Sequence, residues 1–437
     1  MSTRFSRVAG ASVILFIGIM IGMFVRQGMS AKQSEDSGAV GYLSDGNPSD
    51  EEVTGGYELV PDWPKPMSAW PGHEGWSWGA TQGVFAESPD KVFVIQRGEL
   101  PEILPVNKIP RTIGTVVELP LGTKGNNVRF AVPVIRQFPR NASLDSIASP
   151  GEPAVPLYQG IEGKDYRWEH LINVFNREGS LVESWTQWDK MIGRPHKIDI
   201  NPYDPEKRVW ISDDKNHCFY VFSNDGKKLL MTIGARGEKG EDDRHFGRAN
   251  DIAWLPDGTF FITDGYENTR VVKFDKNGKF LMAWGKRGEE FKETRPDYFN
   301  VPHGIAIDKQ RRVYIADRSN RRIMVYDENG TFITQWYLGD ISTTYDLLMT
   351  EDQHLWLSDG HANYKMYKYD LTGRMLYTFG GWGIEPGQIW GVHQFSVDQE
   401  GNFYTAEVNS ARAQKFRPKK GANPAKLIGQ PVRAAWK

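Results

Sequence analysis

One unit recurs along the chain and constrains its fold more than any other feature. Each copy has an apolar strand ending in a D-x-x-G-like turn, an aromatic-rich strand closing on Asp or Glu, a variable turn, and a segment of the type VVKFDKNGKFLMAWG. Five copies begin at His196, Asn250, His303, Tyr345 (to within one residue) and His393. A sixth copy is split: Gln82 begins its first two strands, and His170 begins its outer pair after an insertion.

The pattern inside each copy predicts a four-stranded antiparallel sheet. Apolar and polar residues alternate with period two, and D-G, N-G or E-G turns separate the segments. One such sheet cannot bury both of its faces, whereas six sheets stacked radially bury them and hide most strand edges. We find no helical periodicity of any length after residue 30. The sequence therefore predicts an all-β, six-bladed β-propeller over residues 66–430.

An insertion at about residues 100–166 interrupts the first blade. It is rich in proline and carries mixed apolar patches. Long insertions between regular elements are more often functional or docking surfaces than idle loops. Because it leaves the blade just after Arg97, we expect it to cover the face that carries the site described below.

The N-terminus reads as a targeting segment. Arg4 and Arg7 precede an uncharged stretch, residues 8–25, which Arg26 ends. Its length fits a short membrane-spanning helix and exceeds most signal-peptide cores, so we predict a signal-anchor helix within residues 1–31, with a cleaved signal peptide as the alternative. Both interpretations place the rest of the chain outside the cytoplasm. Residues 32–65 are rich in Ser, Gly, Asp and Glu and predict a flexible linker.

Charge and cysteine content exclude several classes of partner and scaffold. The formal net charge of −2 does not favour nucleic acid or an anionic membrane surface, so membrane contact is expected only through the N-terminal segment. Cys218 is the only cysteine, which excludes an intrachain disulfide. We expect a monomer.

Histidines occupy alternate positions around the predicted channel. In a propeller blade the innermost strand starts at the face to which the second strand returns, so both ends share one rim. His196, His303 and His393 start the first strands of blades two, four and six. Three imidazoles about 120° apart suit a divalent metal such as zinc with an open coordination position. For any one of them alone a hydrogen bond to a neighbouring carbonyl is the simpler interpretation; the other six histidines lack the symmetry and are assigned to the surface or to packing.

The ends of the second strands add three further candidates. Five of the six close on Asp or Glu, which we expect to accept backbone N–H bonds from the following turn. Arg97, Tyr266 and Arg318 stand at or just after these ends, on the same rim. Two arginines beside a metal suit a carboxylate substrate, and a tyrosine there is suited to act as a general base. Salt bridges to the repeated acids remain the alternative for either arginine.

These positions resemble peptidyl-α-hydroxyglycine α-amidating lyase, the second catalytic module of peptide-amidating enzymes. P-H at strand starts and A-D-R-x-N are partly generic to NHL repeats, but their combination with D-G-Y-x-N-x-R is more specific. The resemblance spans residues 83–416 apart from the insertion. The stretches that carry it are VIQRG around Arg97, RPHKIDI around His196, FGRANDIAWLPDGTFFITDGYENTRVVKF around Tyr266, VPHGIAI around His303, YIADRSNRRI around Arg318 and GVHQFSV around His393.

The resemblance implies a zinc-dependent enzyme. The three histidines would bind the zinc ion, and Arg97, Tyr266 and Arg318 would be the catalytic and substrate-binding residues. The family cleaves a carbinolamide N–C bond and releases a peptide amide and glyoxylate, so the substrate would be a small molecule or peptide with a carboxylate.

The sequence departs from the family in three places. Gln394 stands where the family has an Asp that helps bind a structural calcium ion, which puts calcium in doubt; the remaining calcium ligands would be the main-chain carbonyls of Val84 and Ile198. Glu267 stands where animal members have a cysteine. The chain carries no copper monooxygenase module, so any hydroxylated substrate is expected to come from elsewhere.

Two alternatives belong to other functional classes. A non-catalytic NHL propeller would bind a protein, peptide or glycan at the cell surface. A calcium lactonase-type propeller needs inward acidic residues at the strand starts, where this chain has histidines.

Overall fold

The computed structural model describes residues 50–101, 119–120, 128–129, 162–163, 166–289, 293–339, 343–383 and 385–436. The chain divides into two units, Met1–Ser49 and Asp50–Lys437, and all described elements belong to the second. Within these residues no helix has the length and hydropathy needed to cross a membrane. The predicted anchor, residues 1–31, lies outside the described residues.

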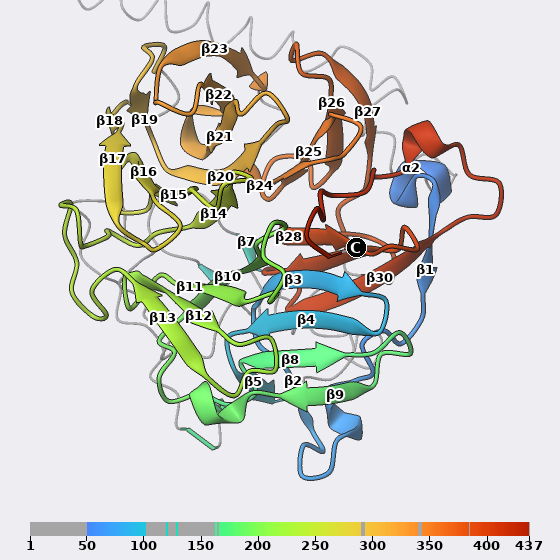
Figure 1. Cartoon of the computed structure of the whole chain (residues 1–437). Coiled ribbons are helices and arrows are strands. Elements are labelled where there is room, and N and C mark those ends of the chain that lie inside the picture. Colours follow the sequence, from blue (N-terminus) through green and yellow to red (C-terminus); the bar gives the residue numbers. More distant parts are fainter. Residues whose placement is uncertain are drawn as a thin grey trace, which may run out of the picture. The chain divides into compact units, whose positions relative to one another are not determined.

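Six four-stranded antiparallel sheets form the blades (Figure 1). Blade one comprises β3 (Thr81–Ser88), β4 (Lys91–Gln96), β8 (Ile172–Phe175) and β9 (Leu181–Ser184). Blade two comprises β10 (Pro195–Ile200), β11 (Val209–Asp213), β12 (Cys218–Phe222) and β13 (Leu229–Ile233). Blade three comprises β14 (Asp251–Trp254), β15 (Phe260–Asp264), β16 (Arg270–Phe274) and β17 (Phe280–Trp284).

The remaining blades repeat this order. Blade four comprises β20 (Pro302–Ile307), β21 (Val313–Asp317), β22 (Arg322–Tyr326) and β23 (Phe332–Tyr337). Blade five comprises β24 (Thr344–Met349), β25 (Leu355–Asp359), β26 (Met366–Tyr369) and β27 (Met375–Phe379). Blade six comprises β28 (Val392–Val397), β29 (Phe403–Glu407), β30 (Arg412–Pro418) and β1 (Tyr57–Val60). Short accessory elements are the helix α2 (Asp50–Thr54) and the pairs β2 (Trp76–Trp78) with β5 (Glu99–Pro101), β6 (Leu119–Pro120) with β7 (Val128–Arg129), and β18 (Lys286–Arg287) with β19 (Tyr298–Phe299).

The core is divided among the interfaces between blades. Each of six hydrophobic clusters joins the facing sides of two neighbouring blades. At the first interface Trp185 lies edge-on between Phe93 of blade one and Phe222 of blade two. At the last, Val84 and Val94 of blade one share a cluster with Tyr404 of blade six. The clusters therefore close a ring, and the predicted six-bladed all-β propeller is confirmed.

The N-terminal strand β1 closes the ring. It pairs antiparallel with β30, with Tyr57 opposite Pro418 and Val60 opposite Lys415. Tyr57 is fully buried, and its hydroxyl accepts a hydrogen bond from the Ile428 N–H at 2.8 Å. The prediction of a flexible linker over residues 32–65 is therefore wrong at its C-terminal end, because these residues supply the fourth strand that blade six lacks.

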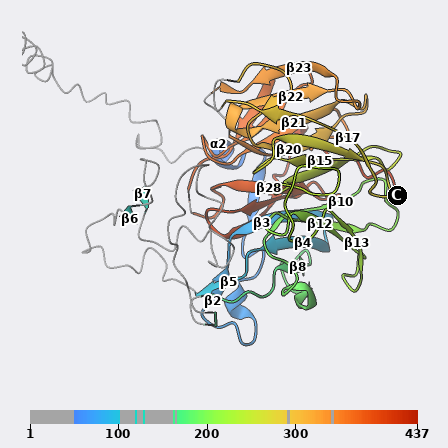
Figure 2. The same cartoon turned by 90° about the vertical axis from the view of Figure 1, so that its left-hand side faces the viewer.

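Blade one is split as predicted. β4 pairs with β8, with Val92 opposite Phe175 and Ile95 opposite Ile172, although many residues separate the two strands in sequence. The insertion between them, predicted at about residues 100–166, lies mostly outside the described residues. Where it begins, β5 pairs with β2, and both lie beside blade one on one face of the ring (Figure 2).

The C-terminal segment crosses the opposite face, where the innermost strands end (Figure 2). Pro431 bridges to Thr350 of blade five, and Arg433 donates to carbonyls of blades six and one (Val397 and Ala86). Trp436 then packs edge-on against Phe85 at a centroid distance of 5.9 Å. The segment thus joins the far ends of several blades, and its contacts extend past the predicted boundary at residue 430.

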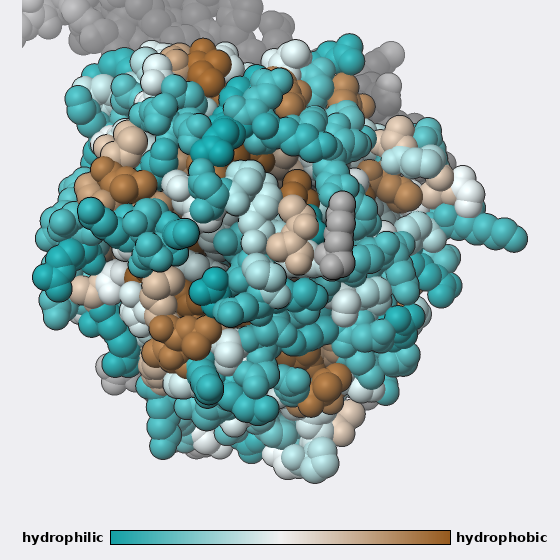
Figure 3. All heavy atoms as spheres, in the orientation of Figure 1, coloured by the Kyte–Doolittle hydropathy of each residue, from teal (hydrophilic) through white to brown (hydrophobic). Residues whose placement is uncertain are grey.

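Exposed apolar side chains are dispersed. In the space-filling view they form small separate areas between polar side chains (Figure 3). Most of the large ones stand on the outermost strand of a blade: Val182, Leu230, Leu281, Ile333, Tyr337, Met375 and Leu376. The face shown in Figure 3 therefore offers no continuous apolar docking surface.

Candidate active site

A hydrogen bond repeated in every blade positions the strand starts around the channel. The last side chain of each second strand accepts a hydrogen bond from a backbone N–H group. The donor lies two or three positions before the residue that the sequence analysis assigns to the strand start (Gln82, His196, Asn250, His303, Tyr345 or His393). The six pairs are Gln96 with Gly79, Asp213 with Gly193, Asp264 with Gly247, Asp317 with Asn300, Asp359 with Thr343, and Glu407 with Trp390, at 2.7–3.1 Å. The expected bonds to the following turn also occur, for example from Asn216 N–H to Asp213. The repeated acid is structural, and it pins the loop that leads into the rim.

At the rim itself the innermost strands bulge. In five blades the register with the second strand shifts across the strand-start residue, as between Pro195 and Lys197 or between Val392 and Gln394. A β-bulge leaves one residue unpaired and redirects its side chain, and such bulges are common next to active sites. The bulged residues here include all three predicted metal-binding histidines.

The three histidines converge as the sequence predicts. His196, His303 and His393 are all buried, and one nitrogen of each lies within 4.8 Å of the others. Each Nδ1 contacts the carbonyl oxygen of the strand-start residue in the next blade: Asn250 at 3.1 Å, Tyr345 at 2.6 Å and Gln82 at 2.7 Å. Because a carbonyl only accepts hydrogen bonds, each Nδ1 carries the proton and each Nε2 presents a lone pair.

Burial keeps these imidazoles neutral. It lowers the pKa of His196 to about 3 and holds the pKa values of His303 and His393 well below the usual range. At His303 the positive charge of Arg318 adds to the effect of burial. Neutral imidazole is the form that binds a metal ion.

Tyr266 joins two of the imidazoles. Its hydroxyl oxygen lies 3.0 Å from His196 Nε2 and 3.1 Å from His303 Nε2, and Arg318 Nη1 lies 3.5 Å from it. The guanidinium groups of Arg248 and Arg318 lie over its ring at 4.5 and 5.3 Å from the centroid. Tyr266, Arg318 and the histidines therefore form one constellation, as predicted.

Arginines make the rim strongly positive. Arg194 and Arg248 both bond the buried carboxylate of Asp214, and the second pair is 2.8 Å apart. Burial alone would raise the pKa of Asp214, but these two arginines hold it well below its usual range. Arg97 also acts on this carboxylate, and Arg318 lies against Tyr266 on the same rim, so guanidinium groups outnumber the buried carboxylate and favour an anion.

Arg97 has a buried nitrogen, Nε, without a hydrogen-bond partner among the described residues. Burial, together with Arg194, lowers the pKa of Arg97 to about 10. Neither Arg97 nor Arg318 forms a salt bridge with a repeated acid within the described part of the chain. The salt-bridge alternative for these two arginines is therefore not supported.

The channel residues fit a metal ion. Two Nε2 lone pairs compete for the single hydroxyl hydrogen of Tyr266, so the site has more acceptors than hydrogens. A set of three neutral imidazoles held by backbone carbonyls is the donor set that zinc prefers in catalytic sites. The residues that would hold zinc are His196, His303 and His393.

The residues do not fit the calcium ion of the resembling family. Gln394 donates through Nε2 to the Ile198 carbonyl at 2.7 Å, so one of the two expected main-chain ligands already accepts a hydrogen bond. Beside it the buried Lys197 ammonium bonds Asp346 and, at 3.1 Å, Asp251. Lys197 thus supplies a positive charge inside the channel without a bound cation.

Arg248 and Asp214 were missed from the sequence. The signal was present: the motif G-R-x-[HN] precedes the strand starts of blades two and three, as Gly193–His196 and Gly247–Asn250. Asp214 looked like a second copy of the repeated acid, whereas only Asp213 performs that structural role.

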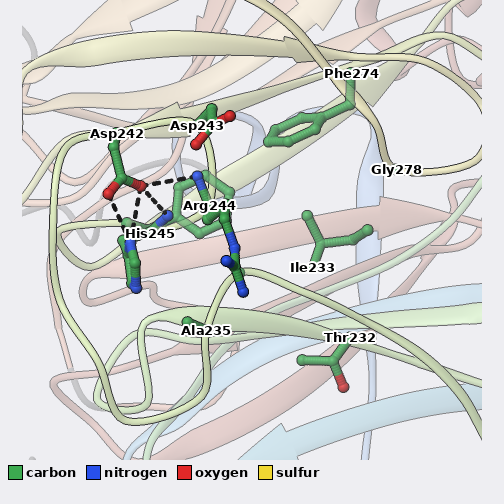
Figure 4. A pocket seen from close by; sticks show the side chains of 11 residues that line it. Thr232, Ile233, Ala235, Asp242, Asp243, Arg244, His245, Phe274 and Gly278 are labelled. Atoms are coloured by element: carbon green, nitrogen blue, oxygen red, sulfur yellow. Dashed lines mark hydrogen bonds and ion pairs between the residues drawn. The ribbon is translucent and has the colours of Figure 1, made fainter.

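A separate surface pocket contains none of the rim residues. It lies beside the outermost strand β13, between Ile233, Phe274 and the loop Asp242–His245 (Figure 4). His245 Nδ1 contacts Asp242 there at 2.8 Å, and the histidine is partly exposed. The pocket is an ordinary surface hollow between blades two and three.

Comparison with known proteins supports the fold and the resemblance. A family model described as a 6-bladed beta-propeller matches residues 239–379. The chain is 28% identical over 255 residues to peptidyl-alpha-hydroxyglycine alpha-amidating lyase 1 of Drosophila melanogaster, covering 53% of this chain and 46% of the relative. A probable peptidyl-alpha-hydroxyglycine alpha-amidating lyase of Caenorhabditis elegans is 31% identical over 36% of this chain and 42% of its own length.

A relative named for its repeats also matches. NHL repeat-containing protein 3 of Homo sapiens is 29% identical over 174 residues, which cover 38% of this chain and 48% of that protein. The chain therefore spans less than half the length of each of these relatives. The resemblance drawn from the motifs is confirmed: the chain is a six-bladed β-propeller that is similar in sequence to peptidyl-α-hydroxyglycine α-amidating lyases and to an NHL repeat-containing protein.

Proposed function

We propose that the chain is an extracytoplasmic zinc-dependent lyase that cleaves a carbinolamide N–C bond to give an amide and glyoxylate. One observation carries the proposal: the Tyr266 hydroxyl lies within 3.1 Å of two buried Nε2 atoms and 3.5 Å from Arg318. A propeller that only bound a partner would not need a phenol, three buried imidazoles and uncompensated guanidinium groups in its channel.

The arginines select the substrate. The glyoxylyl part of a carbinolamide carries a carboxylate, and guanidinium binds carboxylates through two parallel hydrogen bonds. Arg97 has an unsatisfied, buried Nε, and Arg318 lies against Tyr266, so the carboxylate would lie between them and the imidazoles. The C-terminal segment crosses the other face, so substrate would reach the site from the face of Arg97 and Tyr266.

The reaction needs one proton to move from oxygen to nitrogen. When the hydroxyl loses its proton, its electron pair forms the aldehyde C=O bond, the C–N bond breaks, and the amide nitrogen takes up a proton. Tyr266, as a phenolate, would accept the hydroxyl proton and return it to the nitrogen. A zinc ion bound by the three histidines would supply a Lewis acid for the hydroxyl oxygen.

The cellular location is part of the proposal. The charged and uncharged pattern of residues 1–31 supports a signal-anchor or signal peptide, which would place the propeller outside the cytoplasm, attached by this segment or released. We propose that it acts there as a monomer on a small molecule or peptide.

Glyoxylate release tests the reaction directly. The purified full chain is incubated with a peptide ending in α-hydroxyglycine, and glyoxylate and peptide amide are measured together with zinc content. We expect both products in equal amounts, and we expect His303→Ala to lose one equivalent of zinc and the activity. His245→Gln, outside the channel, is the matched control and should change neither.

The outcomes separate the alternatives. If wild type and His303→Ala hold the same amount of zinc, the channel is not a metal site and a binding function is favoured. If the channel zinc is present but neither product forms, the chain acts on a different substrate.

A further inference from the structure

A second group of histidines and carboxylates lies outside the channel, beside blade one. It consists of His73, Glu99, Glu169 and His170, whose ligand atoms all lie within 4.8 Å of one another. The sequence alone assigns both histidines to the surface or to packing, because neither shares the symmetry of the channel set. Folding brings the four residues together from three separate segments of the chain.

The group lies at the neck of the insertion. Glu99 begins β5, and its backbone N–H and carbonyl bond those of Arg167 at 2.8 and 3.0 Å. The chain therefore passes side by side where it leaves and rejoins blade one. Glu169 and His170 follow, about 70 residues after Glu99 in sequence. A bond between these ligands would close that long loop.

Glu99 is at the centre of the group. Its side chain is fully buried, with Oε2 2.9 Å from His73 Nδ1 and Oε1 2.7 Å from His170 Nδ1. The first contact is a hydrogen bond, but neither Oε1 nor His170 Nδ1 has a hydrogen-bond partner among the described residues. The contact at 2.7 Å is an ion pair when the imidazole is protonated; burial opposes this protonation, but Glu99 raises the pKa of His170. When His170 Nδ1 carries no proton, this nitrogen and Oε1 both present lone pairs, which is the arrangement expected of two ligands of one cation.

One guanidinium group and two indole rings surround the group. The nearest guanidinium, of Arg167, is 3.8 Å from Glu99 Oε2; it donates to the Gly72 carbonyl at 3.0 Å and lies over the Trp76 ring. Trp70 lies edge-on to both imidazoles, at 5.7 Å from His73 and 5.6 Å from His170. The carboxylate thus lies in an aromatic environment, where its only permanently charged partner within 4 Å among the described residues is Arg167 and its nearest partners are the two imidazoles. The Glu169 side chain is 42% exposed and leaves the group open to solvent.

The backbone at His170 is constrained to hold its imidazole in place. Its φ of 57° is in the left-handed region, which residues with a β-carbon rarely adopt. The Asp189 carboxylate accepts hydrogen bonds from the backbone N–H groups of His170 and Leu171 at 2.9 and 3.1 Å. The side-chain amides of Gln96 and Asn173 donate hydrogen bonds to the His170 carbonyl. Four hydrogen bonds therefore fix an uncommon conformation that directs the side chain at Glu99.

We propose that His73, Glu99, Glu169 and His170 bind a divalent transition-metal ion such as zinc, independently of the channel. Two imidazoles and two carboxylates are ligands that zinc accepts in a four-coordinate site. The ion ties both ends of the insertion to the loop before β2. Glu99 follows Arg97 by two residues, so the bound ion also fixes the end of the strand that carries this arginine.

The number of bound zinc ions tests the proposal. In the full chain with His196, His303 and His393 all replaced by glutamine, only the second group remains. After dialysis against zinc and then against buffer, mass spectrometry should find one zinc per chain, and zinc should raise its melting temperature. Adding Glu99→Gln and His170→Gln should remove both the bound zinc and the shift.

The wild-type background gives a second measurement in case the channel variant does not fold. There the chain should hold two zinc ions, and Glu99→Gln with His170→Gln should hold one, whereas His245→Gln should still hold two. A folded channel variant that binds no zinc, or a wild-type count that the Glu99 and His170 changes leave unaltered, overturns the proposal. If the wild-type chain binds two zinc ions but releases no glyoxylate, that result counts against the lyase function alone and leaves the second zinc site standing.

Discussion

Gly265 explains how a tyrosine reaches the channel from blade three. A β-carbon at this position would lie 1.9 Å from the Pro302 carbonyl oxygen of blade four, and the Gly265 N–H bonds Asn250 Oδ1 at 2.8 Å. Only glycine allows the two blades to approach this closely without a backbone shift. The next residue, Tyr266, therefore starts from a fixed point and extends to both His196 and His303.

Replacing Tyr266 with phenylalanine tests its chemical role. The substitution removes the hydroxyl and keeps the ring that Arg248 and Arg318 contact, so zinc content and folding should not change. Loss of a positioned acid–base group typically lowers the rate by about 10²–10⁴-fold, and we expect kcat for glyoxylate release to fall in this range. Tyr337→Phe, on an exposed part of β23, is the control. Unchanged kcat in Tyr266→Phe would exclude it as the proton acceptor.

Replacing Gln394 with aspartate, together with a calcium titration of the wild type, tests whether the protein needs calcium for its stability. Gln394→Asp removes the amide that donates to the Ile198 carbonyl and places a carboxylate near Asp199, which lies 3.5 Å from the amide nitrogen. Losing this buried hydrogen bond should lower the free energy of unfolding by about 1–3 kcal/mol in calcium-free buffer. Adding calcium should leave the melting temperature of wild type unchanged. A calcium-dependent rise in wild type would contradict the assignment.

At the scale of the strands, the repeat was predictable because burial imposes period two on every blade. Alternation marked the first three strands of each copy, and the D-G and N-G turns marked their ends. β1 carried no such signal: YELV is short and follows an acidic stretch, and only its pairing with β30 makes it a strand. The pairing joins the two ends of the propeller, so it depends on ring closure rather than on local pattern.

The same distinction applies to the site. His196, His303 and His393 were found because symmetry of the repeat predicts where strand starts meet. Arg248 stands at a position that blades two and three share, but its pairing with Asp214 is a contact between blades that the repeat does not specify. The group of His73, Glu99, Glu169 and His170 depends in the same way on contacts along the neck of the insertion. Lys197 is a further example, since it follows a strand start in blade two and bonds acids of blades three and five.

Lys197 and its two acidic partners, Asp251 and Asp346, should be important for the stability of the innermost strands. Lys197→Met would leave Asp251 and Asp346 buried without their cation, a change that typically costs about 3–5 kcal/mol. Urea unfolding should show this decrease, and Lys197→Met combined with Asp251→Asn and Asp346→Asn should recover part of it. Lys207→Met removes a partly exposed lysine paired with Glu87 at 3.1 Å and should change stability by less than about 1 kcal/mol. Equal effects of the two lysine substitutions would contradict a special role for the channel cluster.

At the scale of the whole propeller, burying three neutral imidazoles makes the metal-free protein sensitive to acid. The pKa of His196 falls from 6.5 to about 3 on folding, and those of His303 and His393 also fall, so the unfolded chain binds more protons than the folded one below about pH 6.5. Their contribution to stability is therefore complete above pH 6.5 and is lost as the pH falls toward the folded-state values.

At pH 5 the proton linkage of His196 alone should lower the free energy of unfolding of the metal-free protein by about 2 kcal/mol relative to pH 7. Urea titrations of the metal-free chain across this range measure the total, and the variant with glutamine at His196, His303 and His393 isolates the contribution of the channel. Carboxylates elsewhere titrate equally in both proteins, so the difference between their pH profiles belongs to the three imidazoles. Parallel profiles would mean that the histidines are solvated and able to take up protons in the folded chain, which is incompatible with a buried site of neutral metal ligands.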